Sequence, residues 1–371
     1  MREHRFGIGI IGCGNVSRSH AKAYQSLADQ CDIKAVADPQ RERAAALAAS
    51  VGEGVGVYED YRKLLERDDI DVVSVCTPPF AHLEPVIEAL KAGKHVLVEK
   101  PFGPSLEDCD RMIEAARRYG RKLCVTFQYR YRQDFNQIRH LIRTGALGPI
   151  VFAQMSGLYW RGDAYYDVAW RGTWATECGG VTMNQAIHPL DIFLWLMGDV
   201  ESVYAETDTV AHDIEVEDWS AAILKFRNGA VGQVLCTVNS VQSDIRMVFS
   251  GKTRGVSIPL AFHAVCENEG GFPVADEQGV KELERLASEI ASGTDDHTGP
   301  IRDLLQAIRE GRDPTVSGEE GRRVIEIITA IYKSAATGQR VMLPIPKDDP
   351  WYTTEGLHRL VKKRERRRPA G

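Results

Sequence analysis

The feature that most constrains the fold is a glycine-rich turn near the N-terminus. The sequence G-C-G-N-V-S at residues 12–17 follows an apolar run over residues 6–11 and precedes a helical pattern over residues 16–28. This order lets a pyrophosphate approach the backbone at a helix N-terminus, where free N–H groups and the helix dipole stabilise an anion. The turn therefore predicts a dinucleotide site, with Gly12, Gly14, Asn15 and Val16 as cofactor-binding residues.

Asp38 indicates which dinucleotide is bound. It ends the next apolar run, at the spacing expected for an acid that binds a ribose 2′-hydroxyl. A carboxylate at this place repels a 2′-phosphate, so we expect NAD, with NADP less favoured. Arg41 and Arg43 follow closely and weaken that exclusion.

Hydrophobic periodicity predicts an α/β fold with two domains. Over the first third, apolar runs at residues 32–37, 72–76, 94–98 and 123–127 alternate with helical stretches, which is typical of right-handed βαβ units and a parallel sheet. Farther along, alternating runs at 222–226 and 230–235 flank Asn228-Gly229, a strong hairpin signal. We therefore expect an N-terminal Rossmann domain (1–126), then an α+β domain with one large, mostly antiparallel open sheet (127–345), and a C-terminal extension with a basic tail (346–371).

Composition excludes several classes of protein. The chain has 371 residues, a net charge of −6, 43% hydrophobic and 26% charged residues, which is ordinary for a globular protein. Its eight cysteines form no C-x-x-C pair, so we expect no metal site, reduced thiols and a cytoplasmic location. No apolar run is long enough to span a bilayer. The tail over 362–368 carries six basic residues and one acid. It is basic enough to touch nucleic acid or lipid, but we interpret it as a solvated tail and expect neither partner.

Three further segments resemble one family of oxidoreductases. They are C-T-P-P-F-A-H at 76–82, V-E-K-P at 98–101 and G-G-V-T-M-N-Q-A-I-H-P-L-D at 179–191. In this order the chain is similar to the Gfo/Idh/MocA family over residues 6–345. That family includes inositol dehydrogenases, glucose–fructose oxidoreductase and sugar-nucleotide dehydrogenases. The resemblance implies that a Rossmann domain precedes one large open sheet, which often makes a homo-oligomer contact (dimer or tetramer).

The resemblance also implies roles for individual residues. Lys100 is implied as the catalytic lysine and His188 as the second catalytic residue. Inositol dehydrogenases usually have Asp where this chain has Asn184, and the N-Q-x-x-H form also occurs in branches acting on sugar nucleotides and other sugars. Asn orients a hydroxyl but relays no proton. The further cofactor contacts that the resemblance implies are Thr77, Pro78, His82, Glu99, Lys100 and Gln128.

The predicted substrate residues lie in the second domain. A helix is expected over 185–196, and Asn184, His188 and Asp191 have the i, i+4 and i+7 spacing that would place them on one helical face toward a sugar. Sugar rings bind to aromatic faces and bidentate donors, so the segment around 159–172 is the candidate substrate wall, although its aromatic residues could instead pack under the loop or form a subunit contact. The remaining predicted substrate contacts are Arg130, Tyr159, Trp170 and Arg171.

These residues predict an NAD-dependent dehydrogenase that oxidises a secondary hydroxyl of a cyclic polyol or sugar, of inositol or hexose type. The hydride goes to nicotinamide and the hydroxyl proton to a base that works near neutral pH. We expect His188 to accept the proton and Lys100 to polarise the oxygen, and the reverse assignment stays open. The alternatives are a sugar-nucleotide dehydrogenase, an NAD-dependent non-redox glycosidase and a non-catalytic NAD-binding regulator.

Overall fold

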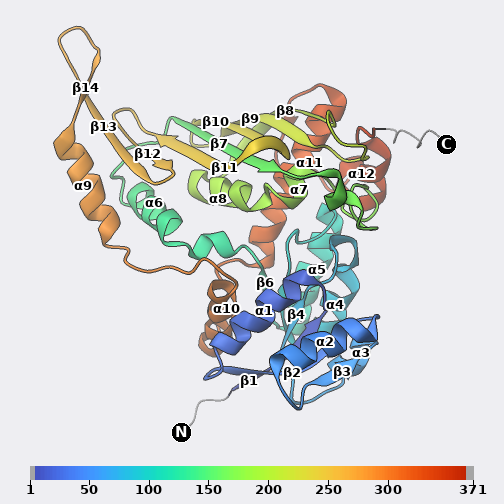
Figure 1. Ribbon diagram of the computed structural model, residues 1–371. Coiled ribbons are helices and arrows are strands. Elements are labelled where there is room, and N and C mark those ends of the chain that lie inside the picture. Colours follow the sequence, from blue (N-terminus) through green and yellow to red (C-terminus); the bar gives the residue numbers. More distant parts are fainter. Residues whose placement is uncertain (1–4, 365–371) are drawn as a thin grey trace. The chain divides into compact units, whose positions relative to one another are not determined.

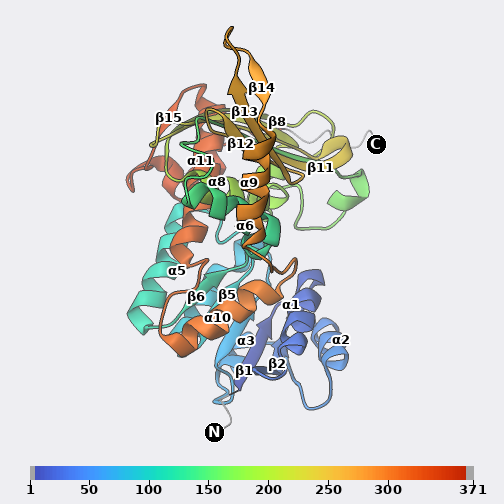
Figure 2. The same cartoon turned by 90° about the vertical axis from the view of Figure 1, so that its left-hand side faces the viewer.

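The computed structural model describes residues 5–364 (Figures 1 and 2). The chain divides into two compact units, one made of 1–128 and 294–325 and the other of 129–293 and 326–371. The predicted boundary after 126 is close to the first crossing point. Assigning 294–325 to the second domain was wrong, because α10 (Thr298–Glu310) packs on α1 (Asn15–Ser26) and Ser317 pairs with Cys124. Residues 346–364 belong to the second unit rather than to a separate extension.

The first unit contains a six-stranded parallel sheet in the order β3-β2-β1-β4-β5-β6. This arrangement confirms the predicted Rossmann fold. The order of strands reverses at β1: β2 and β3 lie on one side of it, and β4, β5 and β6 lie on the other. Open α/β sheets bind ligands at the carboxyl ends of the strands at such a switch point. The strands are β1 (Phe6–Ile11), β2 (Cys31–Ala37), β3 (Gly56–Tyr58), β4 (Val72–Val75), β5 (His95–Val98) and β6 (Leu123–Val125).

Local capping signals fix several helices of this unit. Helix α5 (Leu106–Tyr119) begins after Ser105, whose Oγ accepts the backbone N–H of Asp108 at 3.2 Å, and it ends at Gly120, which is left-handed with φ +62°. The other helices are α2 (Arg41–Val51), α3 (Tyr61–Leu65) and α4 (Leu83–Lys91).

The second unit contains a nine-stranded sheet in the order β14-β13-β12-β11-β7-β10-β9-β8-β15. Among these strands only β7 and β10 pair in parallel, so the predicted mostly antiparallel sheet is confirmed. The Asn-Gly pair makes the β9–β10 hairpin, with Gly229 at φ +91°. The strands are β7 (Phe152–Trp160), β8 (Val200–Asp208), β9 (Trp219–Phe226), β10 (Val231–Thr237), β11 (Asn239–Ser250), β12 (Arg254–Ile258), β13 (Ala261–Glu267), β14 (Pro273–Ala275) and β15 (Val341–Met342).

The helix predicted over 185–196 is α8 (Ile187–Met197), and a separate short helix, α7 (Val181–Asn184), precedes it. Asn184 and His188 therefore lie on different helices, and the prediction that they share one helical face was wrong; His188 and Asp191 do share α8. Pro189 lies in the first turn of α8, where its missing N–H removes no intrahelical bond. The unit also holds α6 (Gln133–Arg143), α9 (Glu277–Ser288), α12 (Thr354–Leu360) and the second part of α11 (Gly318–Thr337).

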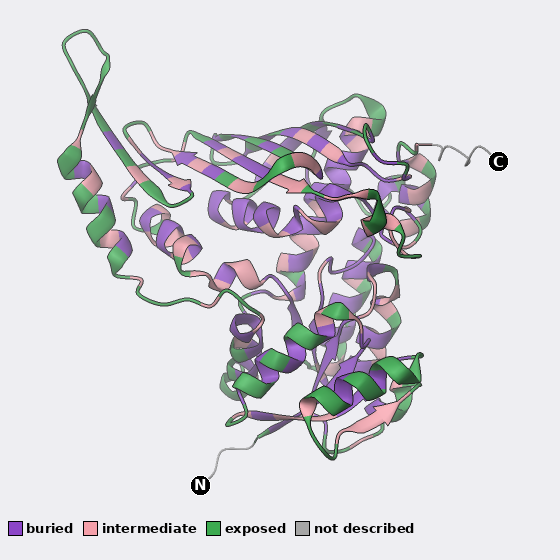
Figure 3. Ribbon diagram, viewed as in Figure 1, coloured by how far each residue is buried: buried purple, intermediate pink, exposed green. Residues whose placement is uncertain are grey.

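Burial follows the strand period in the large sheet (Figure 3). In β9, Ala222, Leu224 and Phe226 are buried, whereas Ile223 and Lys225 are exposed. Helices α7 and α8 contact strands of this sheet. All eight cysteines are free thiols. Among the described residues no helix is long and apolar enough to cross a membrane.

Candidate functional site

The glycine turn has the geometry that a pyrophosphate site needs. Gly12 has φ +87°, and a Cβ added there would lie 2.8 Å from the carbonyl carbon of Cys76, so a side chain is excluded. Gly14 is the N-cap of α1, and a Cβ added to it would meet nothing within 4 Å. Neither a capping side chain nor an acid in the first turn covers the N–H groups of Asn15 and Val16. The open space beside Gly14 therefore fits an anion at a helix N-terminus.

Asp38 lies beside this turn. Its Oδ2 accepts the backbone N–H of Cys13 and its Oδ1 that of Gln40, both at 2.8 Å. Burial, and to a lesser extent the negative charge of Asp38, raises the pKa of the Cys13 thiol to about 12. Asp38 lines a cavity of about 460 Å³ at the carboxyl ends of β1, β2 and β4, which is large enough to hold part of a dinucleotide. The cavity is also lined by Gly12, Pro39, Thr77, Phe80 and Leu83.

The loop after β4 holds three predicted cofactor contacts, and the structure treats them differently. Thr77 lines the cavity and donates its hydroxyl to the carbonyl of Ala81 at 3.0 Å. Pro78 is the N-cap of the short helix at 79–81. His82 is fully buried, with Nε2 2.8 Å from the carbonyl oxygen of Thr77 and Nδ1 3.0 Å from that of Pro101. His82 thus fastens the loops after β4 and β5, and burial lowers its pKa.

Glu99, which precedes Lys100, is held by a buried chain of hydrogen bonds. Its Oε1 lies 2.8 Å from Nε2 of His20 and 3.4 Å from Nε2 of His297, and its Oε2 accepts the backbone N–H of Lys100 at 3.2 Å. Burial alone raises the pKa of Glu99, but the bonds from His20 and His297 outweigh burial and hold that pKa well below its usual range. Lys100 itself is half-buried after β5.

The other ring nitrogen of His20 continues the chain. Nδ1 lies 3.2 Å from the hydroxyl of Ser74, which lies 2.7 Å from the hydroxyl of Tyr24. A neutral His20 that donates to Glu99 accepts from Ser74, and Ser74 accepts from Tyr24, so each group has a partner. Within residues 5–364, His20, Glu99 and His297 also form a group able to hold a metal ion, because their ligand atoms lie within 4.8 Å of one another. The hydrogen bonds account for these atoms without an ion.

Gln128 supplies a test of the fit to NAD. Its Oε1 is buried, and no described residue donates a hydrogen bond to it. It follows β6, at the same edge of the sheet as the glycine turn. A buried acceptor without a donor is costly unless a ligand supplies the donor, and the carboxamide of nicotinamide has two N–H groups. Together with the open Gly14 and with Asp38, the residues present fit an NAD molecule.

In the second unit, Arg130 and Asp191 bind each other. Asp191 is fully buried and accepts hydrogen bonds from Nε of Arg130 at 3.1 and 2.9 Å and from Nη2 at 2.6 Å. Arg130 is 3% exposed, and its guanidinium lies 5.3 Å from the ring of Trp195. Both were predicted as substrate contacts. In the structure they form an internal ion pair that fixes α8 one turn beyond His188.

His188 and Asn184 lie at the junction of α7 and α8. The imidazole of His188 is half-buried, and its ring centre is 5.0 Å from that of Tyr129. Asn184 is half-buried and donates its amide Nδ2 to the carboxylate of Glu177. Glu177 and Glu217 were not predicted.

Glu217 explains the glycine that directly precedes α7, Gly180. It is buried and accepts the N–H of Gly180 at 2.8 Å, the N–H of Thr182 at 3.0 Å and the hydroxyl of Tyr332 at 2.9 Å. A Cβ on Gly180 would lie 1.8 Å from the carbonyl oxygen of Glu217, so only glycine allows this approach. Burial raises the pKa of Glu217 to about 7.

The predicted substrate wall is a stacked cluster of aromatic and arginine side chains. The guanidinium of Arg171 lies 3.5 Å from the ring centre of Tyr165 and 4.8 Å from that of Trp170. Its Nε and Nη1 are buried and find no acceptor among the described residues, and burial lowers its pKa. Tyr159 is the second-last residue of β7, and burial raises the pKa of its hydroxyl. The structure thus brings Tyr165 and Trp170 together through the guanidinium of Arg171.

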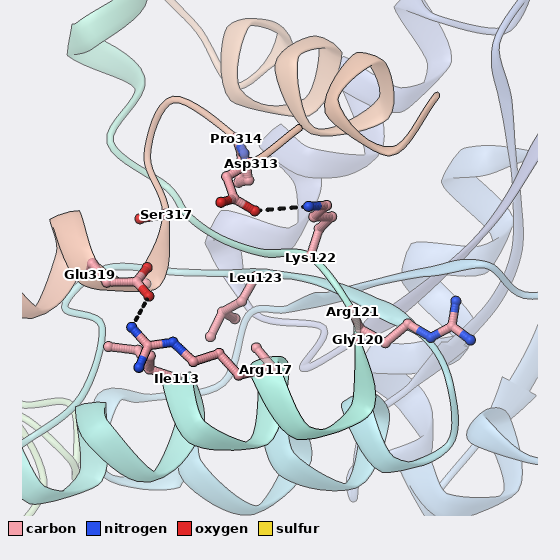
Figure 4. A pocket seen from close by; sticks show the side chains of 12 residues that line it. Ile113, Arg117, Gly120, Arg121, Lys122, Leu123, Asp313, Pro314, Ser317 and Glu319 are labelled. Atoms are coloured by element: carbon pink, nitrogen blue, oxygen red, sulfur yellow. Dashed lines mark hydrogen bonds and ion pairs between the residues drawn. The ribbon is translucent and has the colours of Figure 1, made fainter. Parts of the chain in front are cut away.

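A second cavity of the first unit is a poor candidate for the cofactor site (Figure 4). It lies near the start of β6, at the opposite edge of the sheet from the glycine turn. Two ion pairs engage four of its charged groups, Lys122 with Asp313 at 2.8 Å and Arg117 with Glu319 at 2.8 Å, and Arg121 also lines the cavity. Two of its three cations are therefore neutralised, and neither the glycine turn nor Asp38 lines it.

The parallel sheet, the open glycine turn and Asp38 define an NAD-binding Rossmann oxidoreductase. The family model "Oxidoreductase family, NAD-binding Rossmann fold" matches residues 6–127, and the model "GFO/IDH/MocA C-terminal domain" matches residues 135–257. The chain therefore belongs to the Gfo/Idh/MocA family, as its motifs predicted.

Several known proteins are similar to the chain over nearly its full length. The myo-inositol 2-dehydrogenase of Thermotoga maritima is 27% identical, covering 91% of this chain and 98% of that protein. The D-glucoside 3-dehydrogenase of Escherichia coli is also 27% identical, covering 91% and 97%. The WlbA dehydrogenase of Bordetella pertussis, solved with NADH and UDP-GlcNAcA, has a TM-score of 0.82 and 28% identity, covering 93% of this chain and all of that one.

Proposed function

We propose that this protein is an NAD-dependent dehydrogenase that oxidises a secondary hydroxyl of a cyclic polyol or sugar, of inositol or hexose type. The observation that carries the proposal is the NAD cradle, formed by the open Gly14 at the start of α1 and by Asp38 at the edge of the adjoining cavity. The substrate class is supported by relatives named as dehydrogenases of myo-inositol, of D-glucosides and of levoglucosan.

The proposed chemistry uses a hydride acceptor and two protein side chains. Bound NAD supplies a hydride acceptor at its nicotinamide ring. We assign to His188 the role of accepting the proton of the substrate hydroxyl, because an imidazole exchanges protons near neutral pH and Tyr129 packs against one side of this ring. We assign Lys100 the task of polarising the hydroxyl oxygen. Its backbone is fixed by the Glu99 carboxylate at the ligand-binding edge of the sheet.

Arg171, Trp170, Tyr159 and Asn184 are the residues we propose for sugar recognition. The stacked guanidinium and aromatic rings form a rigid surface of the kind that binds sugar rings. For Arg130 and Asp191 we now propose a positioning role, since each satisfies the other inside the second unit.

A turnover assay tests the proposal. Purified protein is mixed with NAD and with inositols, aldoses, glycosides and sugar acids, and NADH absorbance is followed, with NADP in parallel. We expect turnover with one group of polyols and NAD. K100M and H188N should each reduce turnover by about 100-fold or more while NAD affinity stays within a few-fold. Unchanged turnover in either variant would contradict the assigned role.

A sugar-nucleotide substrate is the second candidate. It is favoured by the similarity to the dehydrogenase solved with UDP-GlcNAcA. UDP-sugars therefore belong in the same panel, and turnover confined to them would replace the free polyol in the proposal.

We also propose that two copies associate through the outer face of the large sheet. This face carries exposed apolar side chains on adjacent strands: Tyr204 pairs with Ile223, and Val231 pairs with Phe152. Light scattering of the protein and of I223E would test the association, because a charge on this face should yield monomers.

The free cysteines support the predicted cytoplasmic location.

A further inference from the structure

A buried carboxylate lies against the amide of Asn184. Glu177 is 2% exposed, and each of its oxygens accepts a hydrogen bond: Oε2 from the N–H of Gly172 at 2.6 Å and Oε1 from Nδ2 of Asn184. Glu177 therefore connects the loop that carries Arg171 with the end of α7. We propose that Glu177 is a positioning residue that fixes the amide of Asn184, with Nδ2 toward Glu177 and Oδ1 on the opposite side.

The chemistry of the two groups sets this orientation. An ionised carboxylate only accepts hydrogen bonds, whereas the amide of Asn184 has a donor on one side and an acceptor on the other. Rotating the amide by 180° would place two acceptor oxygens against each other in a buried site, which is costly. A bond from an amide to a carboxylate is charge-assisted and short. Asn184 thus offers Oδ1 as an acceptor, as an aspartate would, while the negative charge lies at Glu177.

The backbone conformation directly after Glu177 indicates that surrounding contacts hold this residue in place. Cys178 is left-handed with φ +66°, the one described non-glycine residue with positive φ. Such a conformation costs about 1–2 kcal/mol and persists where surrounding contacts impose it. Gly179 follows, and a Cβ there would lie 2.3 Å from the hydroxyl oxygen of Tyr332. The chain is therefore held in an unfavourable turn that places the Glu177 carboxylate on Asn184.

The inference rests on the proposed function, in which Asn184 contacts the substrate, and it predicts a compensating pair of substitutions. N184D brings two carboxylates into hydrogen-bond contact, so the pair must bind a proton or separate. E177Q/N184D restores one donor facing one acceptor. We expect N184D to lose about 100-fold in kcat/KM relative to the wild type at pH 8 and to lose less, relative to the wild type at the same pH, toward pH 5. The double variant should recover to within about 10-fold of the wild type at pH 8.

Thermal unfolding gives a readout that does not depend on turnover. N184D should lower the unfolding midpoint, relative to the wild type at the same pH, more at pH 8 than at pH 5, and E177Q/N184D should remove that difference. The comparison at equal pH cancels the charged and titratable groups near Glu177, which are Arg171, Tyr166, Tyr332 and, beyond Tyr332, Glu217. Q185E is the matched control, because Gln185 bonds the Tyr165 hydroxyl at 2.9 Å and its new charge would not face Glu177.

The outcomes separate the two proposals. A double variant no more stable than N184D at pH 8, or an N184D protein as stable and active as the wild type there, overturns the role of Glu177. A Q185E protein with the same pH-dependent loss as N184D also overturns it. If the wild type turns over no substrate while the unfolding midpoints follow the expected pattern, the positioning of Asn184 stands and the proposed dehydrogenase activity fails.

Discussion

Replacing Asp191 with leucine should strongly destabilise the second unit. The Asp191 carboxylate is fully buried and receives the Nε and Nη2 groups of Arg130 at 2.6–3.1 Å. D191L leaves the Arg130 guanidinium buried without its counter-charge. Removing one partner of a buried pair costs about 3–5 kcal/mol, whereas replacing both by apolar groups of similar size is often close to neutral.

Calorimetry of a variant series measures this effect. For a unit of roughly 200 residues, a loss of about 3–5 kcal/mol lowers the unfolding temperature by on the order of 10 °C. R130M/D191L should recover most of that loss, because methionine keeps the packing on Trp195, whose ring lies 5.3 Å from the Arg130 guanidinium. NAD affinity should stay unchanged in both variants, since Asp38 and the cavity beside it belong to the first unit.

Two results would refute this reasoning. A shift below about 3 °C in D191L would mean that the pair contributes little. A double variant no more stable than D191L would mean that packing, rather than an uncompensated charge, causes the loss. A stable double variant without turnover on any substrate would instead favour the substrate-binding role that the family resemblance implies for both residues.

Three further predictions concern other parts of the chain. D38A should weaken NAD binding by about 10-fold or more and narrow the preference over NADP, as measured by calorimetric titration. E217Q should remove a pH dependence of stability. The folded state raises the pKa of Glu217 from the usual 4.5 to about 7, so Glu217 contributes stability that is fully present below about pH 4.5 and lost as pH rises through about 7. The expected change in the free energy of unfolding, measured with urea, is about 3 kcal/mol. G229A should cost about 1–2 kcal/mol in urea unfolding, because the turn requires φ +91°.

Each of these predictions has a contrary result. Equal affinity of D38A and wild type for NAD would remove Asp38 from the cofactor site. An E217Q protein with the same pH slope as the wild type would assign that slope to other groups. Unchanged stability of G229A would mean that the hairpin tolerates a different turn.

Features with a local chemical signature could be predicted from the sequence. The glycine turn, the Asn-Gly hairpin and the ends of α5 at Ser105 and Gly120 depend on residues close together in the chain. The parallel order of the first sheet followed from the alternation of strands and helices. The family motifs led to Lys100, His188 and Asn184, whose roles stay predictions.

Features built from distant residues could not be predicted. Glu217 accepts a hydrogen bond from Gly180, which lies 37 residues away in the sequence. His297 lies beside Glu99 although a large part of the sequence separates them. Neither acid nor imidazole stands in a motif. The break between α7 and α8 was missed because the spacing of Asn184, His188 and Asp191 fits a single helix. His82 and Asp191 were predicted as ligand contacts from their motifs, but sequence does not reveal that each has an internal partner in the fold.

The return of residues 294–325 to the first unit has a consequence for synthesis on the ribosome. The first 128 residues emerge with the whole parallel sheet but without α10, which packs on α1, and without Ser317, which pairs with Cys124. Nearly 170 residues of the second unit are made before these contacts become available. The nucleotide-binding unit is therefore finished late, after most of its neighbour has been translated. A gene fragment cut at residue 128 would encode an unfinished unit, and dissecting the enzyme requires joining 1–128 to 294–325.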